Sequence, residues 1–138
     1  METVTLTRAF DAPTATVSEQ FEDVESFMLG AGFDAVDVDG DTFTIENGVG
    51  IATIELTLQV VDDPESAFAY EQVDGIFEEM LTTYAIAPLE DGCEVTARTE
   101  FALDVALVGG LMDATVIKRQ RRKELNAQFD WLESAVSS

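Results

Sequence analysis

Residues 111–135 read LMDATVIKRQRRKELNAQFDWLESA, a stretch that contains neither glycine nor proline. Its apolar residues Ile117, Leu125, Phe129 and Leu132 fall within an arc of about 120° when successive residues are placed about 100° apart around a helix. The stretch therefore predicts one long helix with a single apolar face. We expect this face to cover the apolar side of a sheet formed by the residues that precede it.

The preceding residues alternate between apolar and polar side chains, which is the period of a β-strand. One strand is expected to begin at Phe33, and the others are expected over 3–10, 42–46, 50–61, 66–73, 80–89 and 93–101. The turns between them are predicted at Asp39-Gly40-Asp41, Asn47-Gly48, Asp62-Asp63-Pro64 and Asp91-Gly92. Such regular alternation indicates a sheet with one wet face and one covered face.

A helical segment interrupts the strands near the N-terminus. Pro13 suits a helix start, and Val17, Phe21, Val24 and Met28 recur at intervals of four, three and four residues. This spacing predicts one helix or two short helices. The order is then one strand, a helical pair, six strands and a long helix, which we interpret as a single α+β domain over residues 1–138.

The chain carries 28 acidic and 7 basic residues, a formal net charge of −21. Forty of the 138 residues are Leu, Ile, Val or Phe, so the sequence predicts a full core rather than disorder. The negative charge argues against general nucleic-acid binding and against attachment to an anionic membrane. Because the acids are dispersed and only two residues are Lys, we predict a protein of a salt-adapted, halophilic organism. The alternative is a DNA-mimicking or cation-binding acidic protein.

Several features of the sequence limit the cellular compartment and the cofactors that we expect for this protein. No stretch approaches the ~18 apolar residues of a membrane span, and the N-terminal residues lack signal-peptide features, so we predict a cytoplasmic protein. The lone Cys93 and the absence of histidine exclude an internal disulfide and a Cys/His zinc site. Asp37, Asp39 and Glu46 match some positions of a calcium loop, but Ala35 stands at its first ligand position. We therefore expect no metal and no cofactor.

Two stretches carry a resemblance to a known family. Phe10-Asp11-Ala12-Pro13 followed by Val17 and Phe21, and the ending Phe129-Asp130-Trp131-Leu132-Glu133, resemble the START-like (SRPBCC) helix-grip superfamily. This superfamily includes polyketide cyclase/dehydrase and lipid-transport-like proteins. The resemblance implies an antiparallel sheet wrapped around the C-terminal helix, with a cavity between them for an apolar or amphipathic ligand. Some members are enzymes and many only bind, so the resemblance assigns no catalytic residue.

The segment 118–123 holds five of the seven basic residues. Lys118, Arg121 and Arg122 fall on or beside the apolar arc of the predicted helix, whereas Arg119 and Lys123 point away from it. In a helix-grip fold this arc faces the cavity. Our hypothesis is that Arg121, with Lys118 or Arg122, holds a carboxylate or phosphate head group. The alternative is that these cations extend to the surface and pair with acids.

Tyr70, Tyr84, Phe27 and Arg8 are further candidates, each with a plainer alternative. The two Tyr hydroxyls suit orienting a ligand in an apolar pocket and Phe27 suits lining it, but all three also suit ordinary core packing. Arg8 shares the parity of inward-facing residues, or it pairs with an acid at the sheet edge.

The function that these candidates predict is binding of a small hydrophobic or amphipathic, lipid-like ligand. In one form of this hypothesis the ligand is anionic. The alternatives are a cyclase/dehydratase-type enzyme, in which a cavity Tyr and Arg stabilise an enolate, and an interaction protein without a cavity. A continuous internal pocket well above about 300 Å³ would favour binder or enzyme.

Overall fold

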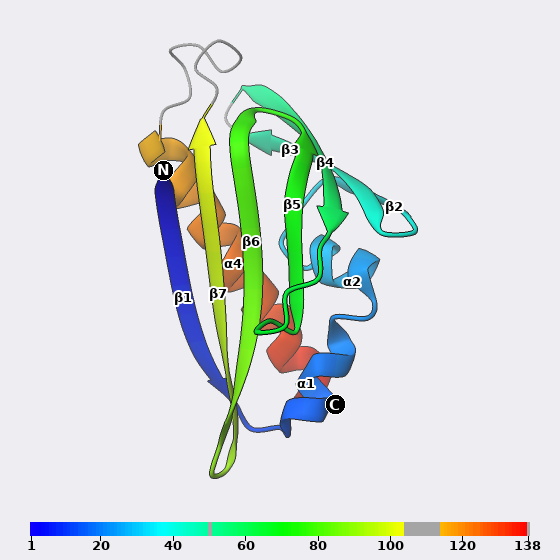
Figure 1. Ribbon diagram of the computed structural model, residues 1–138, viewed down its shortest axis with the longest axis vertical. Coiled ribbons are helices and arrows are strands. Elements are labelled where there is room, and N and C mark those ends of the chain that lie inside the picture. Colours follow the sequence, from blue (N-terminus) through cyan, green and yellow to red (C-terminus); the bar gives the residue numbers. More distant parts are fainter. Residues whose placement is uncertain (50, 104–113, 138) are drawn as a thin grey trace.

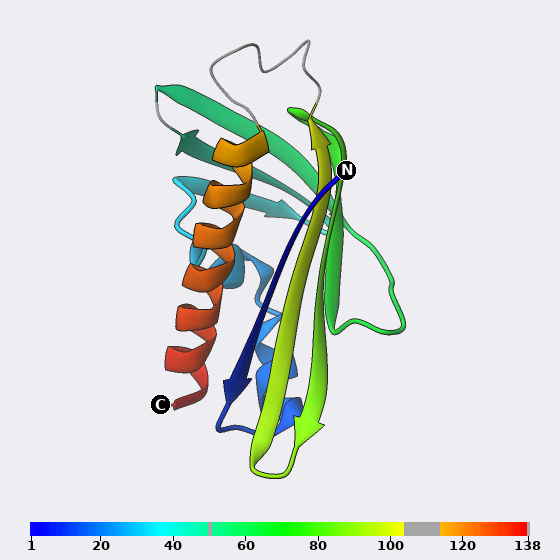
Figure 2. The same cartoon turned by 90° about the vertical axis from the view of Figure 1, so that its left-hand side faces the viewer.

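An antiparallel sheet curves around one long helix in the computed structural model, which describes residues 1–49, 51–103 and 114–137 (Figures 1 and 2). The elements in chain order are β1 (Glu2–Phe10), α1 (Thr14–Gln20), α2 (Val24–Leu29), β2 (Ala35–Asp39), β3 (Thr42–Val49), β4 (Ala52–Val60), β5 (Phe68–Asp74), β6 (Phe77–Leu89), β7 (Gly92–Leu103) and α4 (Ala114–Ser137). The α+β helix-grip architecture predicted from the sequence is confirmed.

The seven strands lie in the order β1-β7-β6-β5-β4-β3-β2, and each neighbouring pair is antiparallel. The first strand therefore pairs with the last, and α1 and α2 carry the chain from that edge of the sheet to the opposite edge at β2. In Figures 1 and 2 these two short helices lie near the C-terminal half of α4. The sheet and the three helices thus enclose one interior.

The alternation predicted for the last strand is confirmed. Cys93, Val95, Ala97 and Phe101 of β7 are all fully buried, because they face α4 and the interior. Glu94, Thr96, Arg98 and Glu100 alternate with them on the outer face, whereas Thr99 shares the buried face. The register pairs β7 with β1 on one side and β6 on the other. Burial on one side only accounts for the alternation of apolar and polar residues along the strand.

The predicted long helix is confirmed over the residues that the structure describes, while 111–113 and Gly109-Gly110 lie outside them. Its buried residues include the apolar Ile117, Leu125, Phe129 and Leu132 that the wheel placed on one face. The same face also buries three polar residues, namely Arg121, Glu124 and Gln128. Burying a polar group costs free energy unless the group is hydrogen-bonded. The hydrogen-bond partners of these three residues therefore determine which of their donors and acceptors stay free.

The two short helices close one end of the interior. Asp23 caps α2 by accepting a hydrogen bond of 3.2 Å from the backbone N–H of Ser26. Gly30 ends α2 against α4, where a Cβ atom would lie only 2.8 Å from Cβ of Trp131. Only glycine permits this close approach without a shift of the Trp131 side chain.

One predicted turn is wrong. Asn47 and Gly48 lie within β3, paired with Ile54 and Thr53 of β4, and the strand ends only at Val49. The turn chemistry of an Asn-Gly pair is overridden here because the Asn47 side chain is buried and hydrogen-bonded to α4. The turn at Asp39-Gly40-Asp41 is confirmed, with Gly40 at a φ of 65° between β2 and β3.

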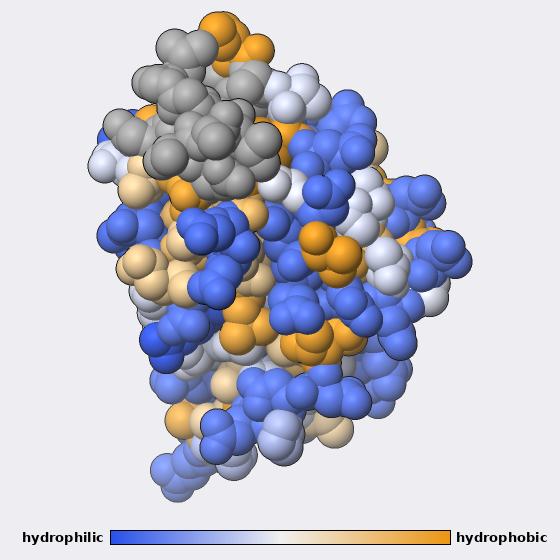
Figure 3. Space-filling view, turned by 45° about the horizontal axis from the view of Figure 1, so that its top comes forward, coloured by the Kyte–Doolittle hydropathy of each residue, from blue (hydrophilic) through white to orange (hydrophobic). Residues whose placement is uncertain are grey.

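The surface is mixed. Figure 3 shows one face on which hydrophilic residues surround small groups of exposed apolar residues. Large apolar side chains exposed among the described residues are Met1, Leu29, Val38, Ile51, Val73, Leu81 and Leu89. Single exposed apolar residues of this kind are ordinary on a protein surface. No helix within 1–49, 51–103 or 114–137 combines the length and the apolar character needed to cross a membrane.

Candidate functional site: a pocket with a buried arginine

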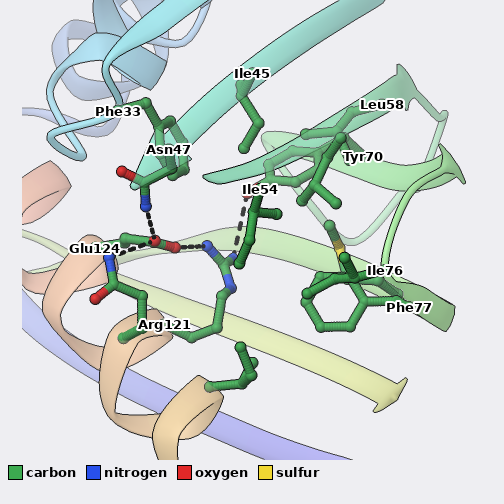
Figure 4. A pocket seen from close by; sticks show the side chains of 14 residues that line it. Phe33, Ile45, Asn47, Ile54, Leu58, Tyr70, Ile76, Phe77, Arg121 and Glu124 are labelled. Atoms are coloured by element: carbon green, nitrogen blue, oxygen red, sulfur yellow. Dashed lines mark hydrogen bonds and ion pairs between the residues drawn. The ribbon is translucent and has the colours of Figure 1, made fainter. Parts of the chain in front are cut away.

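A pocket lies between the inner face of the sheet and the first half of α4 (Figure 4). Its strand side is almost wholly apolar, whereas its helix side is mostly polar. The lining residues are Phe33, Ile45, Asn47, Ile54, Leu56, Leu58, Tyr70, Ile76, Phe77, Met80, Ile117, Gln120, Arg121 and Glu124. Its free volume is about 30 Å³, which is room for a water molecule or two.

Arg121 is the centre of the polar side, with only 7% of its surface exposed. Its Nη1 donates a hydrogen bond of 2.6 Å to Oε1 of Glu124. Its Nη2 donates to the hydroxyls of Tyr70 and Thr82, at 3.3 and 3.2 Å. The buried Nε–H has no hydrogen-bond acceptor among the described residues. The guanidinium therefore keeps its Nε–H unused beside the pocket.

Burial by itself acts to lower the pKa of Arg121, because it penalises the charged form. Tyr70, Glu124 and Tyr84 act in the opposite direction, and together they raise the pKa of the Arg121 guanidinium above its usual value. Arg121 is therefore a permanent cation inside the fold.

Glu124 supplies the opposite charge and is itself 5% exposed. Besides the Arg121 contact, its Oε2 accepts hydrogen bonds of 3.1 Å from Nδ2 of Asn47 and 3.0 Å from Nε2 of Gln120. The carboxylate is thus held by groups from both β3 and α4. The dashed lines in Figure 4 follow this network from Asn47 through Glu124 to Arg121.

A buried ion pair of this kind is weak evidence of stabilisation. Taking two charges out of water costs several kcal/mol per ion, and well-packed apolar residues often replace such a pair without loss of stability. Buried ionisable groups beside a pocket are instead a common mark of a functional site. The Arg121–Glu124 pair is therefore the strongest candidate for a functional feature in the described part of the chain.

Tyr84 is fully buried but does not line the pocket. Its Oη donates a hydrogen bond of 2.5 Å to Oε1 of Gln128, and Nε2 of Gln128 donates to the sulfur of Met28 at 3.6 Å. Burial raises the pKa of Tyr84 well above its usual value, and the neighbouring Tyr70 raises it further. Tyr84 is therefore a neutral hydrogen-bond donor that helps to hold α4 against α2 and β6.

This raised pKa predicts a pH dependence of stability. Because the folded protein holds the Tyr84 proton more tightly than the unfolded chain does, its stabilising effect is complete below the unfolded pKa of about 10. We expect the free energy of unfolding to fall as the pH rises above about 10, measured by urea denaturation across that range. In the variant Tyr84→Phe this part of the pH dependence should disappear. An unchanged slope in the variant would show that the phenol is not shielded as described.

The candidates from the sequence separate into two groups. Arg121 and Tyr70 come together at the pocket, joined by the hydrogen bond described above. Lys118 is half-buried and its Nζ lies 3.5 Å from Oε1 of Glu2 at the sheet edge. Arg122 is exposed. Of the three cations placed on or beside the apolar arc, only Arg121 lines the pocket.

Phe27 and Tyr84 belong to an aromatic cluster rather than to the pocket lining. The ring of Phe27 lies 4.9 Å from Phe21, 5.0 Å from Tyr84 and 5.9 Å from both Phe68 and Trp131, measured between centroids. Phe27 is fully buried there. The cluster packs α2, β5, β6 and α4 together.

Arg8 pairs with acidic residues at the sheet edge, which is the plainer of the two alternatives for this residue. Its Nη1 lies 2.8 Å from Oδ1 of Asp130 and 3.2 Å from Oε2 of Glu133, both on α4. The guanidinium carbon also lies 5.3 Å from the centroid of the Phe129 ring. These contacts join the β1 edge to the long helix, away from the pocket.

Sequence reasoning missed four polar residues of this network: Asn47, Thr82, Gln120 and Glu124. A signal existed for two of them. Asn47 shares the strand parity of Phe43 and Ile45, and Glu124 lies about 20° from Ile117 around the helical wheel. Asn47 falls in the predicted Asn47-Gly48 turn, and the hypothesis for the apolar arc concerns its cations and not its acids.

The described residues contain no candidate site for metal binding or thiol chemistry. Within 1–49, 51–103 and 114–137, no three His, Cys, Asp or Glu side chains are grouped so as to hold a metal ion. Burial raises the pKa of Cys93, which therefore stays a thiol on the inner face of β7, outside the pocket lining. The pocket itself offers hydrogen-bond donors and an apolar wall.

Three solved structures share the fold of this chain over nearly their whole length. TTHA0849 from Thermus thermophilus superposes with a TM-score of 0.80 at 17% identity, covering 98% of this chain and 97% of that one. A START superfamily protein from Mycobacterium smegmatis gives 0.73 at 15%, covering 98% and 97%. The Zhui aromatase/cyclase of a Streptomyces species gives 0.74 at 19%, covering 96% and 93%. The fold is thus that of the START-like helix-grip class.

Residues 1–136 also match the family described as polyketide cyclase / dehydrase and lipid transport. Because the match spans almost the whole chain, the protein belongs to this family. No curated protein sequence matches the chain.

Proposed function

We propose that this protein binds a small, predominantly apolar ligand in the pocket between the sheet and α4, with Arg121 contacting the ligand's polar group. One observation carries the proposal: a buried guanidinium lies opposite the mostly apolar strand side of the pocket and keeps its Nε–H unused by the described residues. Apolar walls with a few convergent polar groups are typical of small-molecule sites. The family description, which includes lipid transport, is in keeping with such a ligand.

The pocket must open to receive this ligand. Its free volume of about 30 Å³ is far below the roughly 300–1,000 Å³ of typical ligand sites. Tyr70 supplies a second polar contact, since its hydroxyl lies beside the guanidinium. Lys118 and Arg122 have no direct part in the proposal because neither lines the pocket.

The small free volume favours a second candidate. In it, α4 simply fills the sheet, and the Arg121–Glu124 network serves only to hold the helix in register against β3 and β6. The protein would then act through its surface rather than through a bound small molecule. The two candidates differ in a measurable way, namely whether the purified protein carries or takes up a ligand.

Native mass spectrometry of the purified protein, followed by organic extraction of any bound species, tests the proposal. We expect an adduct with the mass of a small apolar compound. The adduct should be lost in the variant Ile54→Phe, because the phenyl ring is larger than the Ile54 side chain and fills the pocket. Val73→Phe is the matched control, because Val73 is 58% exposed and lies outside the pocket lining. A protein that carries no adduct, and takes up none from a lipid extract, would favour the second candidate.

A further inference from the structure

We infer that the pocket selects a neutral ligand with a carbonyl-type oxygen and discriminates against a carboxylate or phosphate. This inference rests on the proposed function, which it narrows to a ligand class. It differs from the sequence-based hypothesis of an anionic head group, because the structure shows what the Arg121 cation and its donors are already bound to.

The first argument is the balance of charge. Arg121 and Glu124 are the charged residues among the described pocket lining, and they form an ion pair of 2.6 Å. The positive charge that would attract an anion is thus already neutralised inside the protein. An anionic ligand would leave one uncompensated negative charge in an apolar interior, and that carries a large desolvation cost.

No other described cation of α4 is placed to correct this balance. Lys118 pairs with Glu2 at the sheet edge, and Arg119, Arg122 and Lys123 are exposed. The chain as a whole carries a formal net charge of −21. Long-range attraction therefore does not favour an anion either.

The second argument is the number of free donors. A guanidinium holds a carboxylate or phosphate best through two parallel N–H donors. Here Nη1 donates to Glu124, and Nη2 donates to both Tyr70 and Thr82. Three of the five N–H donors are thus used, and the Nε–H and the second N–H of Nη1 remain. Both parallel pairs of a guanidinium, Nε with Nη2 and Nη1 with Nη2, include Nη2, whose two donors are already taken. The Nε–H therefore suits a single acceptor, as in a ketone, ester or amide carbonyl.

The surroundings of the guanidinium fit the same class. Figure 4 shows it between the Glu124 carboxylate on one side and the apolar Ile54 and Phe77 on the other. A ligand whose carbonyl accepts from Nε–H would thus place its remaining atoms against apolar side chains. An apolar body with a single neutral acceptor satisfies both halves of the pocket.

Three probes of nearly equal shape test this inference: 2-acetylnaphthalene, 2-ethylnaphthalene and 2-naphthoate. They share one apolar body. The first carries a neutral carbonyl, the second carries no polar group, and the third carries an anionic carboxylate. We expect isothermal titration calorimetry at neutral pH to show the ketone binding at least about tenfold tighter than each of the others, a difference of about 1.4 kcal/mol.

The variant Glu124→Gln tests the charge argument directly. It keeps an oxygen that accepts from Arg121 but removes the compensating negative charge, so the pocket gains a free positive charge. We expect naphthoate to bind at least about tenfold tighter to this variant than to the wild type, with little change for the ketone. Glu133→Gln is the matched control, because it removes the same charge from an exposed position on α4. It should leave all three affinities unchanged.

The outcomes separate the inference from the proposed function. If wild-type protein prefers naphthoate, or binds ketone and ethyl compound equally, the inference is overturned while ligand binding stands. If none of the probes binds and native mass spectrometry finds no adduct, the proposed function itself fails. The ranking on wild-type protein decides the inference even if Glu124→Gln does not fold.

Discussion

Replacing Arg121 by methionine should lower the free energy of unfolding by about 3–5 kcal/mol. Methionine fills a similar volume but removes the cation, so the Glu124 carboxylate is left 5% exposed without its ion-pair partner. An unpaired buried charge carries its full desolvation cost, which the hydrogen bonds from Asn47 and Gln120 offset only in part. Urea denaturation followed by circular dichroism measures the effect.

Two further variants show whether the cost comes from the broken pair. Arg122→Met makes the same substitution at the next residue, which is exposed, and should change the free energy of unfolding by no more than about 0.5 kcal/mol. The double variant Arg121→Met with Glu124→Leu removes both charges and should recover most of the lost stability or exceed that of the wild type. Equal effects of Arg121→Met and Arg122→Met would contradict the burial of Arg121.

This set of variants also bears on function. If the double variant is as stable as the wild type, the ion pair does not exist for stability, and a role in ligand selection gains support. If the double variant is much less stable, the pair with its partners Asn47 and Tyr70 is needed to position α4. In either case the carbonyl preference of the probes is measured independently.

Phe27→Ala should lower the free energy of unfolding by about 3–5 kcal/mol, the usual cost of removing a fully buried Phe ring. Phe27 is fully buried and its ring contacts the rings of Phe21, Phe68, Tyr84 and Trp131. Its loss leaves a cavity where α2, the sheet and α4 meet. Because several rings surround the space, the site cannot collapse without moving more than one element.

Leu29→Ala is the matched control for this variant. Leu29 lies two residues away on the same helix and is 43% exposed, so its truncation should cost well under 1 kcal/mol. Phe27→Ala should also leave the preference for 2-acetylnaphthalene unchanged, because Phe27 does not line the pocket. A loss of that preference without unfolding would bring Phe27 back as a ligand contact.

Much of the fold could be predicted from local patterns. Strand alternation such as that of Cys93, Val95 and Ala97 reports a covered face wherever the partner surface lies, since successive side chains point to opposite sides. The glycine-free and proline-free stretch that ends the chain predicted α4 by the same local logic. The Asn47-Gly48 turn failed because a buried contact with Glu124, 77 residues away, outweighed the local preference.

The candidate site could be predicted only in part. The helical wheel placed Lys118, Arg121 and Arg122 on or beside one arc. The angles between these three residues on the wheel are too small to show which of them is buried. Which cation is buried depends on where β5 and β6 place Tyr70 and Thr82, whose hydroxyls receive the Arg121 Nη2 donor. That placement is a property of the packed sheet.

The sequence by itself determined that this protein is an α+β domain with a long C-terminal helix whose inner face carries at least one cation. These features follow from periodicity, which is local to each segment. The tertiary structure alone decided that the cation is Arg121, that Glu124 neutralises it and that Nε–H stays unused by the described residues. Charge balance and hydrogen-bond satisfaction are sums over residues far apart in the chain, so only their positions in space could determine them.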